Sequence, residues 1–213
     1  MLSIPVSDRR RDRRRVGLVC LLFGLAWFSP SHAQDIRVPE APAPDPSAQT
    51  FDIVAPPSCT NSKGETVAFI ETRRGRPGLA AGMARRDREG QPVVIRSNFG
   101  AAPPAFQSFI DRHECAHHQT GDVDRPHPPR NGPEHLMNES ISDCIAIMRL
   151  RDEEGYDGDG LAKVAETMRR DMAKIGFPEI SISSRLSNVR NCFAKTETAT
   201  AYIDKVLTRR GLK

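Results

Sequence analysis

The sequence has no apolar run long enough to cross a membrane comfortably. Its longest run of this kind, Val16–Phe28, falls short of the roughly 20 residues that a transmembrane helix needs. The sequence also lacks an internal repeat. We therefore expect a globular protein, with one domain plus appendages in its 213 residues and no stable membrane span in the mature chain.

Beyond its first fifteen residues, the chain also has little excess charge of either sign. The formal net charge is +4. Six arginines in the first fifteen residues account for this charge: Arg9, Arg10, Arg11, Arg13, Arg14 and Arg15. A nucleic-acid-binding domain would carry basic residues over its own surface. We therefore expect no nucleic-acid partner.

The first 33 residues have the layout of a secretory signal peptide. The arginine cluster is followed by the apolar run Val16–Phe28, and residues 31–33 resemble a small-residue cleavage site. We expect residues 1–33 to be removed and the mature protein to be periplasmic or secreted. An uncleaved anchor is the alternative. The pair Arg14–Arg15 leaves open whether export uses the general or the twin-arginine route.

Four cysteines remain after residue 33: Cys59, Cys115, Cys144 and Cys192. In an exported chain, an even number of cysteines predicts disulfides, here two. Three pairings are possible, and spacing does not choose among them. We favour Cys144–Cys192, which would pin the C-terminal region to the rest of the domain; free buried thiols are the alternative.

The remaining sequence divides into a proline-rich linker at residues 34–57 and a domain at residues 58–213. Thr66–Glu71 and Pro92–Ser97 have the pattern of β-strands, and Leu79–Arg86 is a weaker third candidate. A helical pattern begins after residue 99. We predict an α+β fold, with a small, mostly antiparallel sheet followed by a helical half.

Five helical segments are expected: Ala105–Thr120, Glu134–Glu153, Leu161–Lys174, Ser184–Phe193 and Ala199–Arg210. On the first, one stripe contains Phe106, Phe109, Ile110, His113 and His117. On the second, Ile141, Ile145 and Met148 are expected to face the core. Gly121 is a candidate C-cap for the first helix.

Residues 113–117 read His-Glu-Cys-Ala-His, an H-E-x-x-H motif. Because residues four apart lie one above the other on a helix, His113 and His117 could bind one metal ion. Glu114 could act as the general base, accepting a proton from a water that zinc activates. The alternative is a chance match. Cys115 lies about 200° around the helix from His113, so we expect it to be structural.

Zinc would need a third protein ligand. Six residues are candidates: Asp122, Asp124, His127, His135, Glu139 and Asp143. Thr120 stands where the metzincin pattern requires glycine, which disfavours that family. Glu139 and Asp143 share one face of the second predicted helix. One of these carboxylates could bind the metal while the other orients a ligand histidine.

Together, the motifs HECAH and NESISD resemble the H-E-x-x-H and N-E-x-x-S-D pattern of gluzincins, the thermolysin-like metallopeptidases. The resemblance covers residues 105–150. It implies that His113, His117 and Glu139 bind zinc, that Glu114 is the catalytic base and that Asp143 pairs with a ligand histidine. The chain is also similar to small exported bacterial proteins with an HECAHH helix.

The resemblance implies a zinc-dependent hydrolase that cleaves peptide bonds in a peptide or protein substrate. Two alternatives stay open: cleavage of another amide, such as a cell-wall crosslink, and an inactive envelope protein with a structural zinc site. The sequence does not identify the transition-state donor, for which His127, His135, Tyr156 and an arginine are candidates. We expect His118 at the surface or beside a ligand. Val93–Ser97 is either a core strand or an edge strand that aligns substrate.

Overall fold

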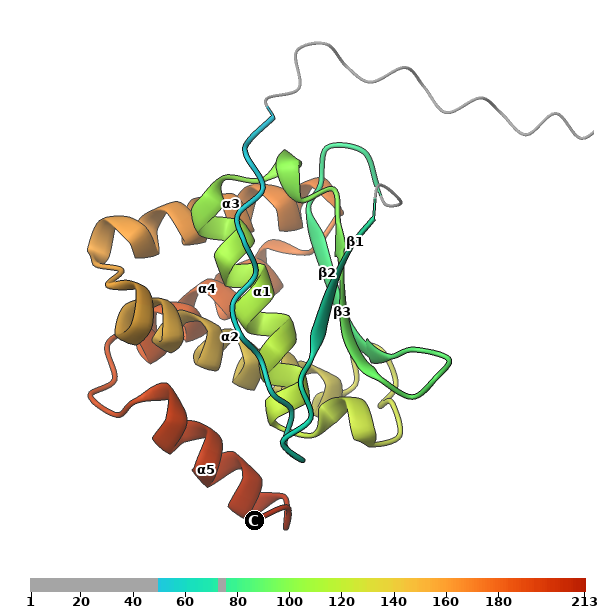
Figure 1. Cartoon of the computed structure of the whole chain (residues 1–213). Helices are drawn as coiled ribbons and strands as arrows, with labels where there is room; N and C mark the ends of the chain where they lie inside the picture. Colours follow the sequence, from blue (N-terminus) through green and yellow to red (C-terminus); the bar gives the residue numbers. More distant parts are fainter. Residues whose placement is uncertain (1–49, 73–75) are drawn as a thin grey trace, which may run out of the picture. The chain divides into compact units, whose positions relative to one another are not determined.

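The computed structural model describes residues 50–72 and 76–213 (Figure 1). The predicted signal peptide and most of the predicted linker lie outside this part. In the described residues, three strands precede five α-helices, which confirms the predicted α+β fold. The strands are β1 (Ala68–Thr72), β2 (Ala81–Arg86) and β3 (Pro92–Ser97).

The sheet has the order β1-β3-β2, with β3 in the middle. A tight turn at residues 87–91 reverses the chain, so β2 and β3 pair antiparallel. Asp87 Oδ1 accepts hydrogen bonds from the backbone N–H groups of Glu89 and Gln91 in this turn. On its other side, β3 pairs with β1 in parallel. The sheet is therefore mixed, where the sequence pattern suggested mostly antiparallel pairing.

The helices are α1 (Pro104–Gln119), α2 (Pro133–Glu154), α3 (Gly158–Lys174), α4 (Glu179–Phe193) and α5 (Ala199–Arg209). Short 3-10 turns, η1 (Phe99–Ala101) and η2 (Asp122–Asp124), flank α1. The five predicted helices are all present, and α4 begins five residues earlier than predicted. Within the described residues, no helix combines the length and the apolar character needed to cross a membrane.

Helix α1 lies between the sheet and the other helices (Figure 1). Phe106 and Phe109 of α1 join one buried cluster with side chains of α2, α3 and α4. A separate cluster contains Ala116, Ile145 and Ile203, which attach α5 to α1 and α2. This packing confirms the apolar stripes that the sequence predicted on α1 and α2.

Two disulfides connect these elements. Cys59–Cys115 ties the segment before β1 to α1, and Cys144–Cys192 ties α2 to α4 as predicted. The bridged cysteines are 56 and 48 residues apart, a separation for which loop-closure entropy gives about 4 kcal/mol of stabilisation each.

The end of the predicted linker contacts the domain. Gln107, whose side chain is fully buried, accepts a hydrogen bond from Val54 N–H through Oε1, at 3.0 Å. Its Nε2 donates to the carbonyl oxygens of Asp52 and Ala102. Arg96 donates to the carbonyl of Val54. Residues 52–54 are therefore bound to the domain in an extended form.

Candidate metal centre

The packing of α1 against α2 brings the two motif histidines together with Glu139. The Nε2 atoms of His113 and His117 are 3.2 Å apart. Glu139 Oε2 is 3.5 Å from His113 Nε2, and Glu139 Oε1 is 3.5 Å from His117 Nε2. These ligand atoms could hold a metal ion.

The three separations suit a tetrahedral ion. Zinc binds histidine nitrogen and carboxylate oxygen at about 2.0–2.2 Å, which places neighbouring ligand atoms of a tetrahedron about 3.3–3.5 Å apart. The measured separations of 3.2 and 3.5 Å match this edge length. Little movement of the side chains would therefore be needed to bind zinc.

His113 is oriented by a buried carboxylate. Asp143 Oδ1 lies 2.9 Å from His113 Nδ1, and the Asp143 side chain is fully buried. Arg185 of α4 donates to both carboxylate oxygens of Asp143, from Nη2 to Oδ1 at 2.6 Å and from Nε to Oδ2 at 2.8 Å. Arg185 Nη2 also lies 3.5 Å from Glu139 Oε2. The structure thus places Asp143 beside one of the two motif histidines, and the resemblance had left open which one.

His117 has a carboxylate partner of its own. Asp122 Oδ2 lies 3.0 Å from His117 Nδ1, and Thr120 Oγ1 donates to the same oxygen at 3.1 Å. Gly121, in the left-handed conformation with φ 75°, turns the chain so that Asp122 faces back toward α1. Arg210 pairs with the other oxygen of Asp122. Sequence reasoning weighed Asp122 only as a ligand and missed this role.

The two histidine–carboxylate pairs fix which nitrogen faces the centre. Each Nδ1 has a carboxylate beside it, hydrogen-bonded for His117 and at 2.9 Å for His113. A proton on that nitrogen leaves Nε2 with a lone pair that faces the centre. The two lone pairs then face each other and the Glu139 carboxylate, with no hydrogen-bond donor between them. Such an arrangement is repulsive unless a cation or a proton lies among the three groups.

The electrostatics of the centre favour positive charge. Burial by itself would lower the pKa of His113, but Asp143 and Glu139 outweigh it and raise that pKa to about 10. Against the same effect of burial, Asp122 and Glu139 raise the pKa of His117 to about 9. Burial disfavours ionised Glu139, yet the two imidazoles hold its pKa far below the ordinary value. The field that binds these protons would equally attract a metal cation.

Glu114 faces the sheet side of the centre. Its Oε2 accepts a hydrogen bond from the backbone N–H of Ala84 in β2, at 2.8 Å. The approach requires glycine at position 82, because a Cβ there would lie 2.7 Å from Ile110 Cγ2 and 2.8 Å from Glu114 Oε1. Strand β2 is an edge of the sheet, whereas β3 is its centre. Val93–Ser97 is therefore the core strand of the two alternatives, and β2, like β1, is an edge strand.

The other candidate ligands lie elsewhere. Asp124 pairs with Arg86 at 2.6 Å and with Lys63 at 2.9 Å. His127 and His135 meet edge to face, with ring centroids 6.0 Å apart. His118 is buried, so the expected surface position is wrong, and its Nε2 lies 3.0 Å from the carbonyl oxygen of Val93.

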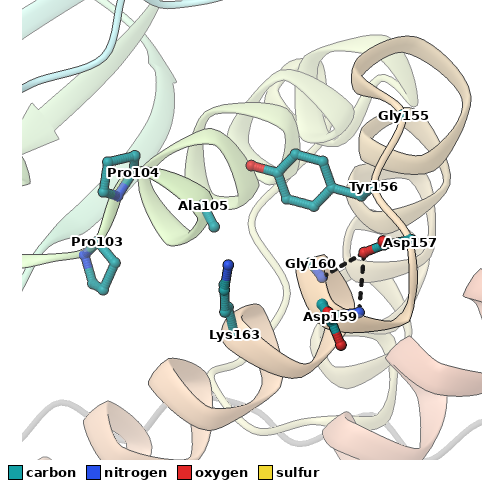
Figure 2. A pocket seen from close by; sticks show the side chains of 9 residues that line it. All are labelled: Pro103, Pro104, Ala105, Gly155, Tyr156, Asp157, Asp159, Gly160 and Lys163. Atoms are coloured by element: carbon teal, nitrogen blue, oxygen red, sulfur yellow. Dashed lines mark hydrogen bonds between the residues drawn. The ribbon is translucent and has the colours of Figure 1, made fainter.

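Tyr156 lies at the far end of α1 from the histidines. It lines a pocket with Pro103, Pro104 and Lys163, where α1 begins and where α2 leads into α3 (Figure 2). His113 is nine residues beyond Pro104, or about 13 Å along the helix axis. The position of Tyr156 therefore gives no support to its candidacy as a transition-state donor.

Groups of three or more His, Cys, Asp or Glu side chains can hold a metal ion. In the described part of the chain, the one such group consists of His113, His117 and Glu139. Comparison with protein-family models, curated proteins and solved structures finds no match for this chain. The candidate centre is thus defined by the side-chain geometry of α1 and α2 and by the groups around it.

Proposed function

We propose that this chain is an exported zinc-dependent peptidase, with His113, His117 and Glu139 as the metal ligands. One observation carries the proposal: three ligand atoms converge with tetrahedral spacing, and the outer nitrogens of the two imidazoles lie 2.9 and 3.0 Å from carboxylate oxygens. Two histidines and one glutamate form a ligand set typical of catalytic zinc. Ligand type alone leaves other divalent metals possible, so zinc is part of the proposal.

The number of ligands favours a catalytic site over a structural one. Structural zinc sites close the coordination shell with four protein ligands, whereas catalytic sites use three and keep one position open. The candidate group in this chain has three members. A carboxylate that does not join the group, Glu114, follows His113 directly on α1. The position of Glu114 is the second argument for chemistry at this centre.

Glu114 would serve as the general base. It stands next to His113 and three residues before His117 on α1, so its side chain can reach the centre. When bound, zinc would polarise the substrate carbonyl and lower the pKa of a water molecule to about 7. Glu114 would accept the proton of the attacking water and pass it to the leaving amine. The hydrogen bond from Ala84 would hold its carboxylate in position.

The edge strand β2 supports a peptide as the substrate. Ala84 is paired in register with Val94 of β3, but its N–H points away from β3 and toward Glu114. In an antiparallel ladder, residues two apart present their backbone groups to the same side, so Gly82 shares this direction. An extended peptide could align along this strand edge beside the metal, while the Ala84 N–H stays bound to Glu114.

Export is supported by the cysteines. Four cysteines form two disulfides in the described residues, which is typical of oxidising compartments. The predicted signal peptide precedes them in the sequence. Both observations agree with a mature protein in the periplasm or outside the cell.

A peptide-library digest tests the proposal. The zinc-loaded mature chain is incubated with peptides of diverse sequence, and new termini are identified by mass spectrometry. We expect cleavage by the wild-type chain and its loss in Glu114→Gln, which keeps the shape of the side chain and removes the base. A metal-loaded chain that cleaves no peptide would overturn the peptidase proposal, and digestion of cell-wall crosslinks would then test the other amide. Equal cleavage by both proteins would mean a contaminating protease.

A further inference from the structure

The C-terminal end of the chain reaches the metal centre through one arginine. Arg210 follows the last residue of α5, and its side chain is only 8% exposed. Its Nη1 donates to the carbonyl oxygen of Thr120 at 2.6 Å and pairs with Asp122 Oδ1. Its Nη2 donates to Asn138 Oδ1 at 2.8 Å. One guanidinium therefore joins the end of α1, the turn η2 and the second turn of α2.

These three contacts adjoin two of the candidate ligands. Asp122 is the carboxylate that binds Nδ1 of His117. Asn138 is buried and directly precedes Glu139. One residue thus separates Arg210 from each of these ligands: Asp122 for His117 and Asn138 for Glu139. No atom of Arg210 belongs to the ligand group itself.

The surrounding packing fixes where Arg210 lies. Ile203 and Val206 of α5 are buried, and Ile203 packs with Ala116 and Ile145. Beyond Arg210, Leu212 covers Gly121: a Cβ at Gly121 would lie 2.6 Å from Leu212 Cδ1. The backbone N–H of Leu212 donates to the carbonyl of Leu207 at 2.9 Å. The C-terminal segment is therefore built onto the turn that carries Asp122.

We propose that Arg210 is a positioning residue for the metal centre, acting on His117 through Asp122 and on Glu139 through Asn138. The inference rests on the metal centre proposed above. Its physical basis is that a carboxylate can orient an imidazole only if the carboxylate itself is fixed. Without Arg210, Asp122 would keep only Thr120 Oγ1 and His117 as side-chain partners. His117 would then be free to turn away from the other ligands.

Zinc affinity measures this role directly. Competition with a chelator gives the Kd of the wild-type chain, of Arg210→Ala and of Arg209→Ala. Arg209 is the matched control, because it is the neighbouring arginine and is exposed. Groups around metal ligands typically contribute 10- to 100-fold to affinity, so we expect Arg210→Ala to weaken zinc binding about tenfold. Arg209→Ala should stay within about twofold of the wild type, because it touches no group around the ligands. Equal affinities for the wild type and Arg210→Ala would refute the role of Arg210.

A second readout separates positioning from general destabilisation. With Co²⁺ in place of zinc, the visible absorption spectrum reports ligand geometry. We expect this spectrum to change in Arg210→Ala and to remain unchanged in Arg209→Ala. Arg210→Lys should recover part of the zinc affinity, because lysine keeps the positive charge but lacks the two Nη groups that bind separate partners. A lower affinity with an unchanged cobalt spectrum would mean that Arg210 supports only the fold, and would overturn the inference.

A double-mutant cycle tests the route through Asp122. If Arg210 acts through this carboxylate, Arg210→Ala should lower zinc affinity much less in an Asp122→Asn background than in the wild type. A full effect in both backgrounds would exclude that route. Failure of the wild-type chain to bind zinc or cobalt would instead refute the proposed metal centre itself. The two failures are therefore distinguishable.

Discussion

The two sides of the candidate centre are built differently. On the helical side, His113, Asp143 and Arg185 form a chain of charged groups in which the central carboxylate is fully buried and doubly bound. On the sheet side, Glu114 is held by one backbone N–H from an edge strand. The carboxylate on the helical side, Asp143, thus has several charged partners. The carboxylate on the sheet side, Glu114, has a single hydrogen bond, next to the edge of the sheet.

This difference indicates a division of labour. Networks of fixed carboxylates around the histidines favour high metal affinity. A half-buried carboxylate beside an edge strand can give up its hydrogen bond and then accept a proton or contact a substrate. We therefore expect substitutions on the helical side to change metal affinity, and substitutions on the sheet side to change the rate of hydrolysis at constant metal content.

The largest expected effect is that of Glu114→Gln on the sheet side. The rate of peptide cleavage should fall by about 10²–10⁴-fold, the usual contribution of a general base. Zinc content should match the wild type, because Glu114 is outside the ligand group. Steady-state kinetics and metal analysis on the same preparation check both parts. Loss of zinc together with activity would mean that Glu114 helps to hold the metal, which would break the proposed division.

The next effect in size is that of Asp143→Asn on the helical side. His113 would lose its charged partner, and we expect zinc affinity to drop by about 10–100-fold. At saturating zinc, the variant should recover most of its activity. Chelator competition measures the change, with the exposed Asp159→Asn as a charge-matched control. Unchanged affinity in Asp143→Asn would show that the His113–Asp143 contact does not support metal binding.

The smallest effect is expected from Gly82→Ala. The added Cβ would collide with the side chains of Glu114 and Ile110, and so displace the base from its position. A 1 Å misplacement can lower a rate by about 100-fold, and we expect on the order of tenfold for this flexible side chain. Zinc affinity should not change. Gly158→Ala, where a Cβ meets nothing, is the control, and a wild-type rate in Gly82→Ala would contradict the role given to this strand.

Much of the fold could be predicted because its signals are local. The apolar stripe of α1 follows from a 3.6-residue period, and Pro133 at the start of α2 and Gly155 at its end limit that helix. The order of the strands could not be predicted, because the parallel pairing of β1 with β3 depends on contacts between residues far apart in the sequence. The early start of α4, at Glu179, was missed for want of a strong periodic signal.

The candidate site also combines features with local sequence signals and features that depend on distant contacts. The spacing of His113 and His117 within one helix is local, and the resemblance suggested Glu139 and Asp143 on the next. Asp122 could have been inferred from Gly121, because a left-handed glycine after a helix turns the chain back. Arg185 and Arg210 contact the carboxylates beside the two histidines, Asp143 and Asp122, across 42 and 88 residues of sequence. No pattern in the sequence distinguishes these two arginines from the many others.

Metal content is the most direct test of the central claim. The mature chain is purified as the wild type, as Glu139→Ala and as His117→Ala, and zinc is measured after dialysis. We predict about one zinc ion per wild-type chain, bound by three protein ligands, and loss of zinc in both variants. Zinc retained in Glu139→Ala would mean that another residue supplies the third ligand. A wild-type chain that binds no metal would contradict the account.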